Sequence, residues 1–217
     1  MSEAPRSFIP AAGHDWLLPL YDPLLRLMGV DRIRAALIDE AAPQPGDRVL
    51  DLGCGTGSLA IQLLAACPEA RVCGMDPDPK ALGRARRKAV QAGVELEWRE
   101  GFADALPFED GSFDCVVSSL VFHHLAPNTV RAVVPEVRRV LRPGGTLNVL
   151  DFGAAGHGIH GLLSHLASHQ HGDEDVAGEL PELMEKAGLV EVESRPTRRT
   201  LLGEVFLTTG KLPDQAA

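Results

Sequence analysis

The chain has 217 residues, 45% of them hydrophobic, and a net charge of -9 at pH 7. The length suits one domain, or one domain with a small cap, and the hydrophobic content allows a full core. The acidic balance argues against nucleic acid as a partner, because phosphate binding relies on clustered basic side chains. The sequence shows no signal peptide and no apolar run near the roughly 20 residues of a membrane span, which predicts a cytoplasmic protein without a membrane partner.

The most informative motif is Val-Leu-Asp-Leu-Gly-Cys-Gly-Thr-Gly at residues 49–57. Its mostly apolar first part predicts a buried strand, and residues 58–64 predict a helix. Between the two, Gly53, Gly55 and Gly57 let the backbone come close to a ligand. The free N–H groups at the start of the helix favour a negative group. This strand, turn and helix together predict a ligand site.

The glycine spacing argues against two common ligands. A dinucleotide fingerprint, G-x-G-x-x-G, needs its third glycine where Ser58 stands, and here that glycine comes one residue early, at Gly57. A phosphate-binding P-loop would end in Gly-Lys-Ser/Thr, which is absent. A nicotinamide-dependent oxidoreductase is therefore disfavoured but stays as an alternative.

The run from Asp51 to Gly57 closely resembles the first motif of the class I S-adenosylmethionine-dependent methyltransferases. In that family the loop holds the methionine part of the cofactor, S-adenosyl-L-methionine. The alternative is an ordinary glycine turn between a strand and a helix.

A second predicted strand, residues 71–76, ends in Asp76, about 20 residues past Gly55. At this spacing a carboxylate can accept hydrogen bonds from both hydroxyls of a ribose. Asp76 could instead cap the next helix, although Asp78 and Pro79 are better placed for that role.

The resemblance continues through a short strand at 94–99 and a loop at 101–108. It places Asp104 beside the adenine amine, where a carboxylate can accept an N–H; the alternative is a plain loop aspartate. The predicted cofactor contacts are Asp51, Gly53, Cys54, Gly55, Gly57, Asp76, Pro77, Ala103, Asp104, Ala105 and Ser119.

A fourth strand, 115–120, is followed by a helix over 128–141, with a kink or a late start expected near Pro135. Arg-Pro-Gly-Gly at 142–145 should stop this helix before a fifth strand at 146–152. The Leu-Arg-Pro-Gly-Gly-Thr-Leu run also resembles the methyltransferase family.

A helix is predicted at 179–186, then two strands at 190–194 and 204–209. The connection between these strands is too short for a parallel crossover, which needs a dozen residues or more, so they should form a hairpin. The resemblance implies an α/β fold, a doubly wound, Rossmann-like, seven-stranded sheet that ends in an antiparallel hairpin, with a small helical cap. We expect one domain, divided into an N-terminal helical cap segment (1–44), a cofactor-binding core (45–152), a cap insertion (153–178) and a terminal helix with the hairpin (179–217).

His123 and His124 follow the fourth strand, and ligands in open α/β sheets bind beyond the carboxyl ends of strands. An oxygen or nitrogen acceptor must lose a proton, and histidine titrates near neutral pH. Adjacent side chains on a turn point apart, so at most one of the two should face the acceptor. We prefer His124, because related enzymes often show histidine followed by leucine there. Alternatively, both histidines cap the next helix or pack beneath the loop, or transfer needs no protein base.

Tyr21, in Leu-Tyr-Asp-Pro, resembles a feature of the small-molecule methyltransferases related to the quinone-biosynthesis enzymes, and it is a third candidate catalytic residue. It could equally be a half-buried packing residue. The tyrosine-rich segment that this resemblance implies after the fifth strand is missing, which argues against a quinone substrate. A histidine-rich, amphipathic stretch at 157–171 stands there, and it predicts a cap helix rather than a metal site.

The sequence therefore predicts methyl transfer from S-adenosylmethionine to a small, partly apolar acceptor, with no metal. A non-catalytic S-adenosylmethionine-binding protein of the same fold is the main alternative. The oligomeric state is not defined by the sequence, and a homodimer remains an option.

Overall fold

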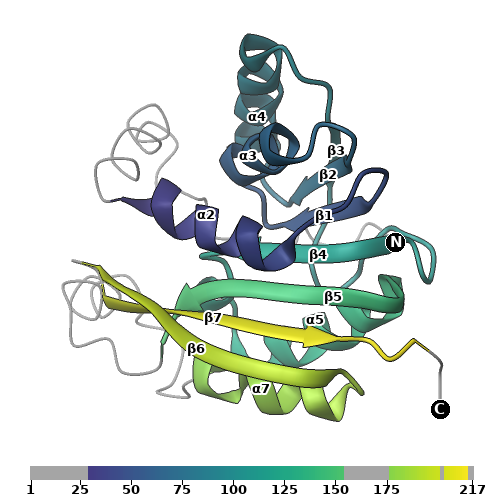
Figure 1. Ribbon diagram of the computed structural model, residues 1–217, viewed down its shortest axis with the longest axis vertical. Coiled ribbons are helices and arrows are strands. Elements are labelled where there is room, and N and C mark those ends of the chain that lie inside the picture. Colours follow the sequence, from purple (N-terminus) through teal and green to yellow (C-terminus); the bar gives the residue numbers. More distant parts are fainter. Residues whose placement is uncertain (1–28, 154–175, 201–202, 215–217) are drawn as a thin grey trace, which may run out of the picture.

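The computed structural model describes residues 29–153, 176–200 and 203–214. These residues form one seven-stranded sheet with the strand order β3-β2-β1-β4-β5-β7-β6 (Figure 1). The strands are β1 (Arg48–Leu52), β2 (Arg71–Asp76), β3 (Glu97–Glu100), β4 (Phe113–Ser119), β5 (Leu141–Phe152), β6 (Val190–Thr200) and β7 (Gly203–Lys211).

Helices cover both faces of this sheet. On one face, α2 (Val30–Ala41) and α3 (Ser58–Ala66) bury their apolar side chains against the strands, and α4 (Pro79–Ala92) packs beside α3. On the other face lie α5 (Pro127–Val140) and α7 (Val176–Lys186). In Figure 1, α3 and α4 lie with β1, β2 and β3 at one end of the molecule, and α7 lies with β6 at the other. Each face thus buries its own apolar core.

The pairing confirms the predicted topology. Strands β3, β2, β1, β4 and β5 are parallel neighbours, whereas β7 runs antiparallel to both β5 and β6. The chain winds outward from β1 in one direction and from β4 in the other. The carboxyl ends of β1 and β4 are therefore the switch point at which open α/β sheets bind ligands.

The boundaries of α5 and β5 differ from the sequence-based predictions. Helix α5 begins at Pro127, since proline is well tolerated in a first turn, and it continues through Pro135, so the late start, one of the two outcomes expected there, is excluded. Strand β5 begins at Leu141, directly after the helix, rather than at residue 146. Leu141 pairs with Phe113 before the register shifts, so residues 142–145 bulge out of a strand instead of forming a separate loop.

The terminal hairpin is longer than predicted. Its strands run to Thr200 and from Gly203, well beyond the predicted 190–194 and 204–209. The charged and polar sequence at the end of β6 lacks the apolar alternation that predicts a strand, and this hid the extension.

Tyr21 and the histidine-rich stretch at 157–171 lie outside the described residues. In the described part of the chain, no helix has the length and apolar content to cross a membrane. The same residues contain no group of three or more His, Cys, Asp or Glu side chains arranged to hold a metal.

Candidate active site

The glycine loop joins β1 to α3 and carries the sharpest backbone constraints of the site. Gly53 and Gly57 adopt φ values of 73° and 75°, in the left-handed region that side chains disfavour. A Cβ atom on Gly53 would lie 2.6 Å from Cγ2 of Val121, and one on Gly57 would lie 2.5 Å from the Trp98 ring. Both positions therefore require glycine on two grounds, conformation and space.

Four N–H groups of this loop make hydrogen bonds within the protein. Gly53 and Cys54 both donate to the carbonyl oxygen of Met75, at 2.8 and 3.0 Å, and Gly57 donates to that of Cys54 at 2.8 Å. Gly55 donates to Oδ2 of Asp76 at 2.8 Å. The loop is thus folded onto the end of β2 by its own hydrogen bonds.

Asp76 ends β2 and is buried. Besides Gly55, its carboxylate accepts the N–H of Asp78 at 2.9 Å. Burial raises the pKa of Asp76 above its ordinary value, and these two backbone donors only partly oppose that effect. Asp78, rather than Asp76, caps α4 by accepting the N–H of Lys80 at 2.8 Å, as the sequence indicated.

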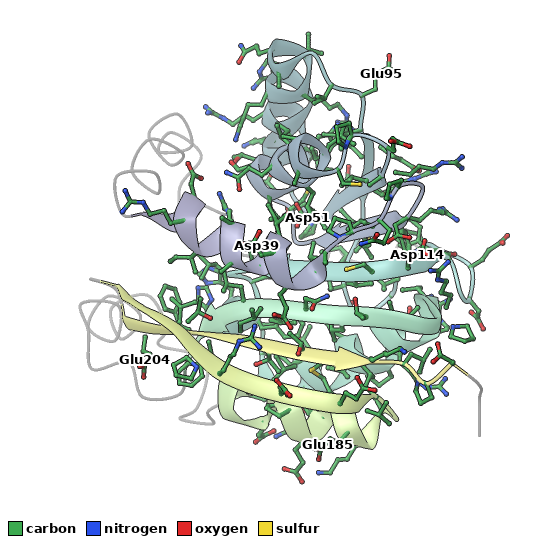
Figure 2. All side chains as sticks on the ribbon, viewed as in Figure 1. Asp39, Asp51, Glu95, Asp114, Glu185 and Glu204 are labelled. Atoms are coloured by element: carbon green, nitrogen blue, oxygen red, sulfur yellow. The ribbon has the colours of Figure 1, made fainter. Side chains whose placement is uncertain are left out.

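Asp51 belongs to β1 and is buried in the interior near α2 (Figure 2). Burial raises its pKa to about 7, although Arg34 on α2 and the N–H of Ala60 in α3 both favour the charged form. Among the described residues, neither its Oδ2 atom nor Nε of Arg34 has a hydrogen-bond partner. A buried carboxylate oxygen without a donor is rare in folded proteins and calls for an explanation, such as a ligand that supplies the donor.

Two residues near this loop escaped the sequence-based analysis. The Trp98 ring of β3 packs against Gly74 as well as Gly57, with a Cβ on Gly74 only 2.5 Å from the ring. Lys88 of α4 donates to Oγ of Ser58 at 2.6 Å. Both contacts join positions far apart in the chain, so no local pattern marks them.

The loop that carries Asp104 is held by α5. Arg139 donates to the carbonyl oxygens of Leu106 and Phe108, at 2.9 and 2.8 Å, and to Asp110 at 2.8 Å. Glu136 pairs with Arg139 at 2.9 Å and also accepts the N–H of Leu106 at 2.8 Å. This network fixes the loop on which the predicted adenine contacts lie.

His123 and Asp151 form a close pair at the carboxyl ends of β4 and β5. Nδ1 of His123 lies 2.5 Å from Oδ1 of Asp151. Asp151 also accepts backbone N–H groups from Phe122 at 2.7 Å and from Phe152 at 2.8 Å, with longer contacts to those of Val121 and His123. Burial alone would raise the pKa of Asp151, but the His123 ring and these donors hold it below its ordinary value.

The pairing with Asp151 determines which nitrogen of the His123 ring can act as a base. An ionised carboxylate only accepts hydrogen bonds, so Nδ1 of His123 carries the proton that joins it to Asp151. In the neutral tautomer Nε2 is then the basic atom. The His123 side chain is only 15% exposed.

The expectation that His123 and His124 point apart was wrong. Their ring centroids lie 3.8 Å apart with the planes tilted by 45°, and His123 also meets Phe152 edge-on at 5.2 Å. Both histidines lie in the short 3-10 helix η2 (Phe122–His124), whose tight turn lets adjacent rings stack. His123 also has the buried carboxylate of Asp151 at hydrogen-bond distance.

The histidine pair adjoins the glycine loop. Val121, whose side chain covers Gly53, is separated from His123 by one residue. Ser119, at the end of β4, has a buried Oγ atom without a hydrogen-bond partner in the described structure. The predicted cofactor residues on β1, β2 and β4 and the histidines thus meet at the switch point of the sheet.

A groove of about 320 Å³ lies next to the His123–Asp151 pair, between α7 and the strands β5, β7 and β6. Three of the residues that line it, Phe122, Asp151 and Phe152, also belong to the surroundings of His123.

Comparison with known proteins agrees with this arrangement. Residues 49–145 match the family model described as a methyltransferase domain. The demethylmenaquinone methyltransferase of Thermus thermophilus is 42% identical over 150 residues, which cover 68% of this chain and 67% of the relative. The chain belongs to the S-adenosylmethionine-dependent methyltransferases.

Two further members of the family show the extent of the likeness. A ubiquinone/menaquinone biosynthesis C-methyltransferase of Paracoccus denitrificans is 41% identical over 137 residues, 61% of this chain and 54% of the relative. The chain therefore matches between about half and two thirds of these relatives' length. A SAM-dependent methyltransferase structure from Aquifex aeolicus, 19% identical, superposes with a TM-score of 0.63 over 82% of this chain and 89% of its own, and it shows the shared fold.

The residues present fit S-adenosylmethionine, the cofactor of the family. Asp51 and Ser119 offer buried oxygen atoms that have no partner within the described part of the chain, and Asp76 offers a carboxylate whose two backbone donors leave further lone pairs. A Cβ atom on Gly53 would collide with Val121 at the joint between the loop and the histidines. The cofactor carries an ammonium group and ribose hydroxyls, which are the donors that such oxygens lack.

Proposed function

We propose that this protein transfers the methyl group of S-adenosylmethionine to an oxygen or nitrogen atom of a small, partly apolar acceptor, with His123 as the base. The observation that supports this most directly is the His123–Asp151 pair beside the glycine loop. It presents a basic nitrogen at the end of the sheet where the cofactor residues meet.

The cofactor contacts are part of the same proposal. Asp76 accepts the ribose hydroxyls, Asp104 accepts the adenine amine, and Asp51 faces the positive end of the methionine part. Pro77, Ala103 and Ala105 flank the adenine, while Gly53, Cys54, Gly55, Gly57 and Ser119 line the loop side. The burial of Asp51 and Asp76 and the clamp on the loop of Asp104 support these assignments.

The cofactor supplies an already activated methyl group on its sulfonium. The chain's own residues then have to align the acceptor, exclude water and take up one proton. In the proposed mechanism Nε2 of His123 accepts the proton that the acceptor's O–H or N–H loses, and Asp151 stabilises the resulting imidazolium. A positioned base of this kind contributes about 10²–10⁴-fold to the rate.

The relatives give one indication of the acceptor. The names of the Thermus and Paracoccus proteins describe reactions of quinone biosynthesis, which involve cyclic, apolar acceptors. An acceptor panel for this protein should therefore include phenols, naphthols and amines of similar size, with S-adenosylhomocysteine release as the readout. If no acceptor releases it while S-adenosylmethionine still binds, the protein is a non-catalytic binding protein.

Single-turnover kinetics at saturating cofactor test the base. We expect His123→Ala to slow methyl transfer at least about 100-fold, the lower end for a lost base, and His124→Ala to slow it only a few-fold. The two variants are matched controls, because their rings are neighbours in η2 and differ in the link to Asp151. If neither slows transfer beyond about threefold, both histidines are structural and the assignment fails.

A further inference from the structure

We propose that Lys88 of α4 is a positioning residue, which holds the second half of the glycine loop in the shape that binds S-adenosylmethionine. It acts through the loop side chains of Thr56 and Ser58 rather than by touching the cofactor. This inference rests on the proposed cofactor contacts of the loop and goes beyond them. Lys88 lies 30 residues after Ser58 and belongs to none of the sequence motifs.

The two halves of the glycine loop are held by different parts of the protein. Gly53, Cys54 and Gly55 donate their N–H groups to the end of β2, at the carbonyl oxygen of Met75 and the carboxylate of Asp76. The second half, residues 56–58, leads into α3. Its side chains are linked to α4 instead of β2.

The link to α4 is made by the ammonium group of Lys88. Nζ of Lys88 donates to Oγ of Ser58 at 2.6 Å and makes a longer contact, 3.4 Å, with Oγ1 of Thr56. The Thr56 side chain is buried, and Lys88 is half-buried. A hydrogen bond from a charged donor is stronger than one between neutral groups, and low exposure strengthens it further. One ammonium group thus fastens two side chains of the loop to α4.

The same part of the loop packs against the Trp98 ring. Trp98 of β3 is paired with Gly74 of β2, and a Cβ atom on Gly74 would lie 2.5 Å from the ring. A Cβ atom on Gly57 would also lie 2.5 Å from the ring, and 2.8 Å from Cβ of Ala85. Ala85 and Lys88 are three residues apart in α4, so they share a face of that helix. The loop therefore lies in a close-packed seat formed by α4 and β3, and Lys88 fastens it there.

The stability of α3 does not explain a lysine at this place. Ser58 is the first residue of α3, and the N-cap residue Gly57 provides no side-chain hydrogen bond. The start of a helix carries a partial positive charge, so a cation beside it is unfavourable. Arg86 and Arg87, the preceding basic residues of α4, are exposed to solvent, whereas Lys88 turns toward the loop. What this position provides is the pair of contacts with the loop.

A loop that is held in its binding shape before the cofactor arrives binds more tightly, because less ordering is needed on binding. Without Lys88 the loop would adopt other shapes for part of the time. The apparent affinity would then fall with the fraction of molecules in the binding shape. We therefore expect Lys88 to determine the affinity for the cofactor.

Calorimetric titration with S-adenosylhomocysteine tests this proposal without any acceptor. Lys88→Met keeps a long side chain and removes the ammonium group. We expect it to weaken S-adenosylhomocysteine binding at least about fivefold, as for the loss of a charge-assisted hydrogen bond. Lys88→Arg keeps a cationic donor and should recover most of the affinity. Arg87→Met is the matched control: it makes a similar change at the neighbouring exposed position and should leave the affinity unchanged.

Hydrogen exchange distinguishes positioning of the loop from a general loss of stability. Without ligand, residues 54–61 of Lys88→Met should exchange faster than in the unaltered protein, while β4 and β5 keep their protection. Saturating S-adenosylhomocysteine should remove the difference.

Three results would overturn the proposal: Lys88→Met binds S-adenosylhomocysteine within about twofold of the unaltered protein, Arg87→Met loses as much affinity, or exchange rises across the whole sheet. An unaltered protein that fails to bind S-adenosylhomocysteine would overturn the proposed cofactor contacts together with this inference. If the affinities are as expected but no acceptor is methylated, the role of Lys88 is supported and the proposed methyl transfer is contradicted.

Discussion

Two buried aspartates, one in each half of the sheet, show how differently the two halves are built. Asp51 on β1 has an oxygen without a donor, and burial raises its pKa to about 7. Asp151 at the end of β5 is equally buried, yet the His123 ring and several backbone N–H groups hold its pKa below the ordinary value. The same side chain is thus unsatisfied in the cofactor half and fully satisfied in the histidine half.

This difference indicates which half of the sheet needs a ligand to complete the hydrogen bonds of its buried aspartate. The donors of Asp151 all come from the protein, so the His123 geometry exists before any substrate arrives. One carboxylate oxygen of Asp51 lacks a hydrogen-bond donor among the described residues, and the cofactor's ammonium group would supply that donor. The folded protein loses stability because the Asp51 carboxylate is buried without a full set of donors. Cofactor binding would restore that stability, a common arrangement at functional sites.

The largest expected effect concerns the satisfied carboxylate. Asp151→Asn should destabilise the folded protein by about 3–5 kcal/mol, because it breaks a buried pair and turns an amide toward N–H donors. Urea unfolding at pH 7 measures this. Asp110→Asn is the control, since that carboxylate is exposed and its pairing with Arg139 should contribute less than about 1 kcal/mol. Equal losses in the two variants would show that Asp151 is not specially held.

A somewhat smaller effect of opposite sign is expected at Asp51. Because its pKa in the folded state is raised, the protein loses stability as the pH rises from about 4, the unfolded value, to about 7, and the loss then stays constant. Asp51→Asn does not titrate, so without cofactor it should be more stable than the unaltered protein at pH 8, by at most about 4 kcal/mol. The two should be nearly equal at pH 4.5.

Unfolding measured at both pH values, with and without S-adenosylmethionine, completes this test. Cofactor should stabilise the unaltered protein more than Asp51→Asn, because only the former offers a carboxylate to the ammonium group. A variant that is no more stable at pH 8, or that gains as much from the cofactor, would contradict the comparison between the two aspartates.

The cofactor half could be predicted well from the sequence, and the reason is local. Its glycines, its strands and Asp76 follow one another within a single β-α-β unit, so spacing alone brings them together. The terminal hairpin was predictable on similar grounds, since chain length between two strands limits how they can pair. The boundaries of β5 and β6 were not, because the bulge after Leu141 and the exposed edge of β6 are set by neighbouring strands.

The histidine half depends on contacts between distant positions, which the sequence does not announce. The histidines were recognised as candidates, but the preference for His124 lacked the information that Asp151 reaches His123 across the end of the sheet. One signal was present: Asp151 directly follows the apolar pair Val149 and Leu150 in the strand, and a buried charge needs a partner. The groove gave no signal at all, because Val149, Ser194 and Phe206 come together only through strand pairing.

The smallest expected effect lies between the two halves, at the α5 clamp on the loop of Asp104. Arg139→Ala should weaken S-adenosylhomocysteine binding by roughly 3–10-fold, the equivalent of about one ordinary hydrogen bond, because it frees the carbonyl oxygens of Leu106 and Phe108. The rate at saturating cofactor should hardly change, since the His123–Asp151 pair is untouched. Hydrogen exchange over residues 104–111 should become faster. Arg138→Ala, an exposed neighbour on the same helix, is the control and should alter neither property. A loss of rate without a loss of affinity would mean that α5 positions the histidines rather than the cofactor loop, and the division between the halves would need to be redrawn.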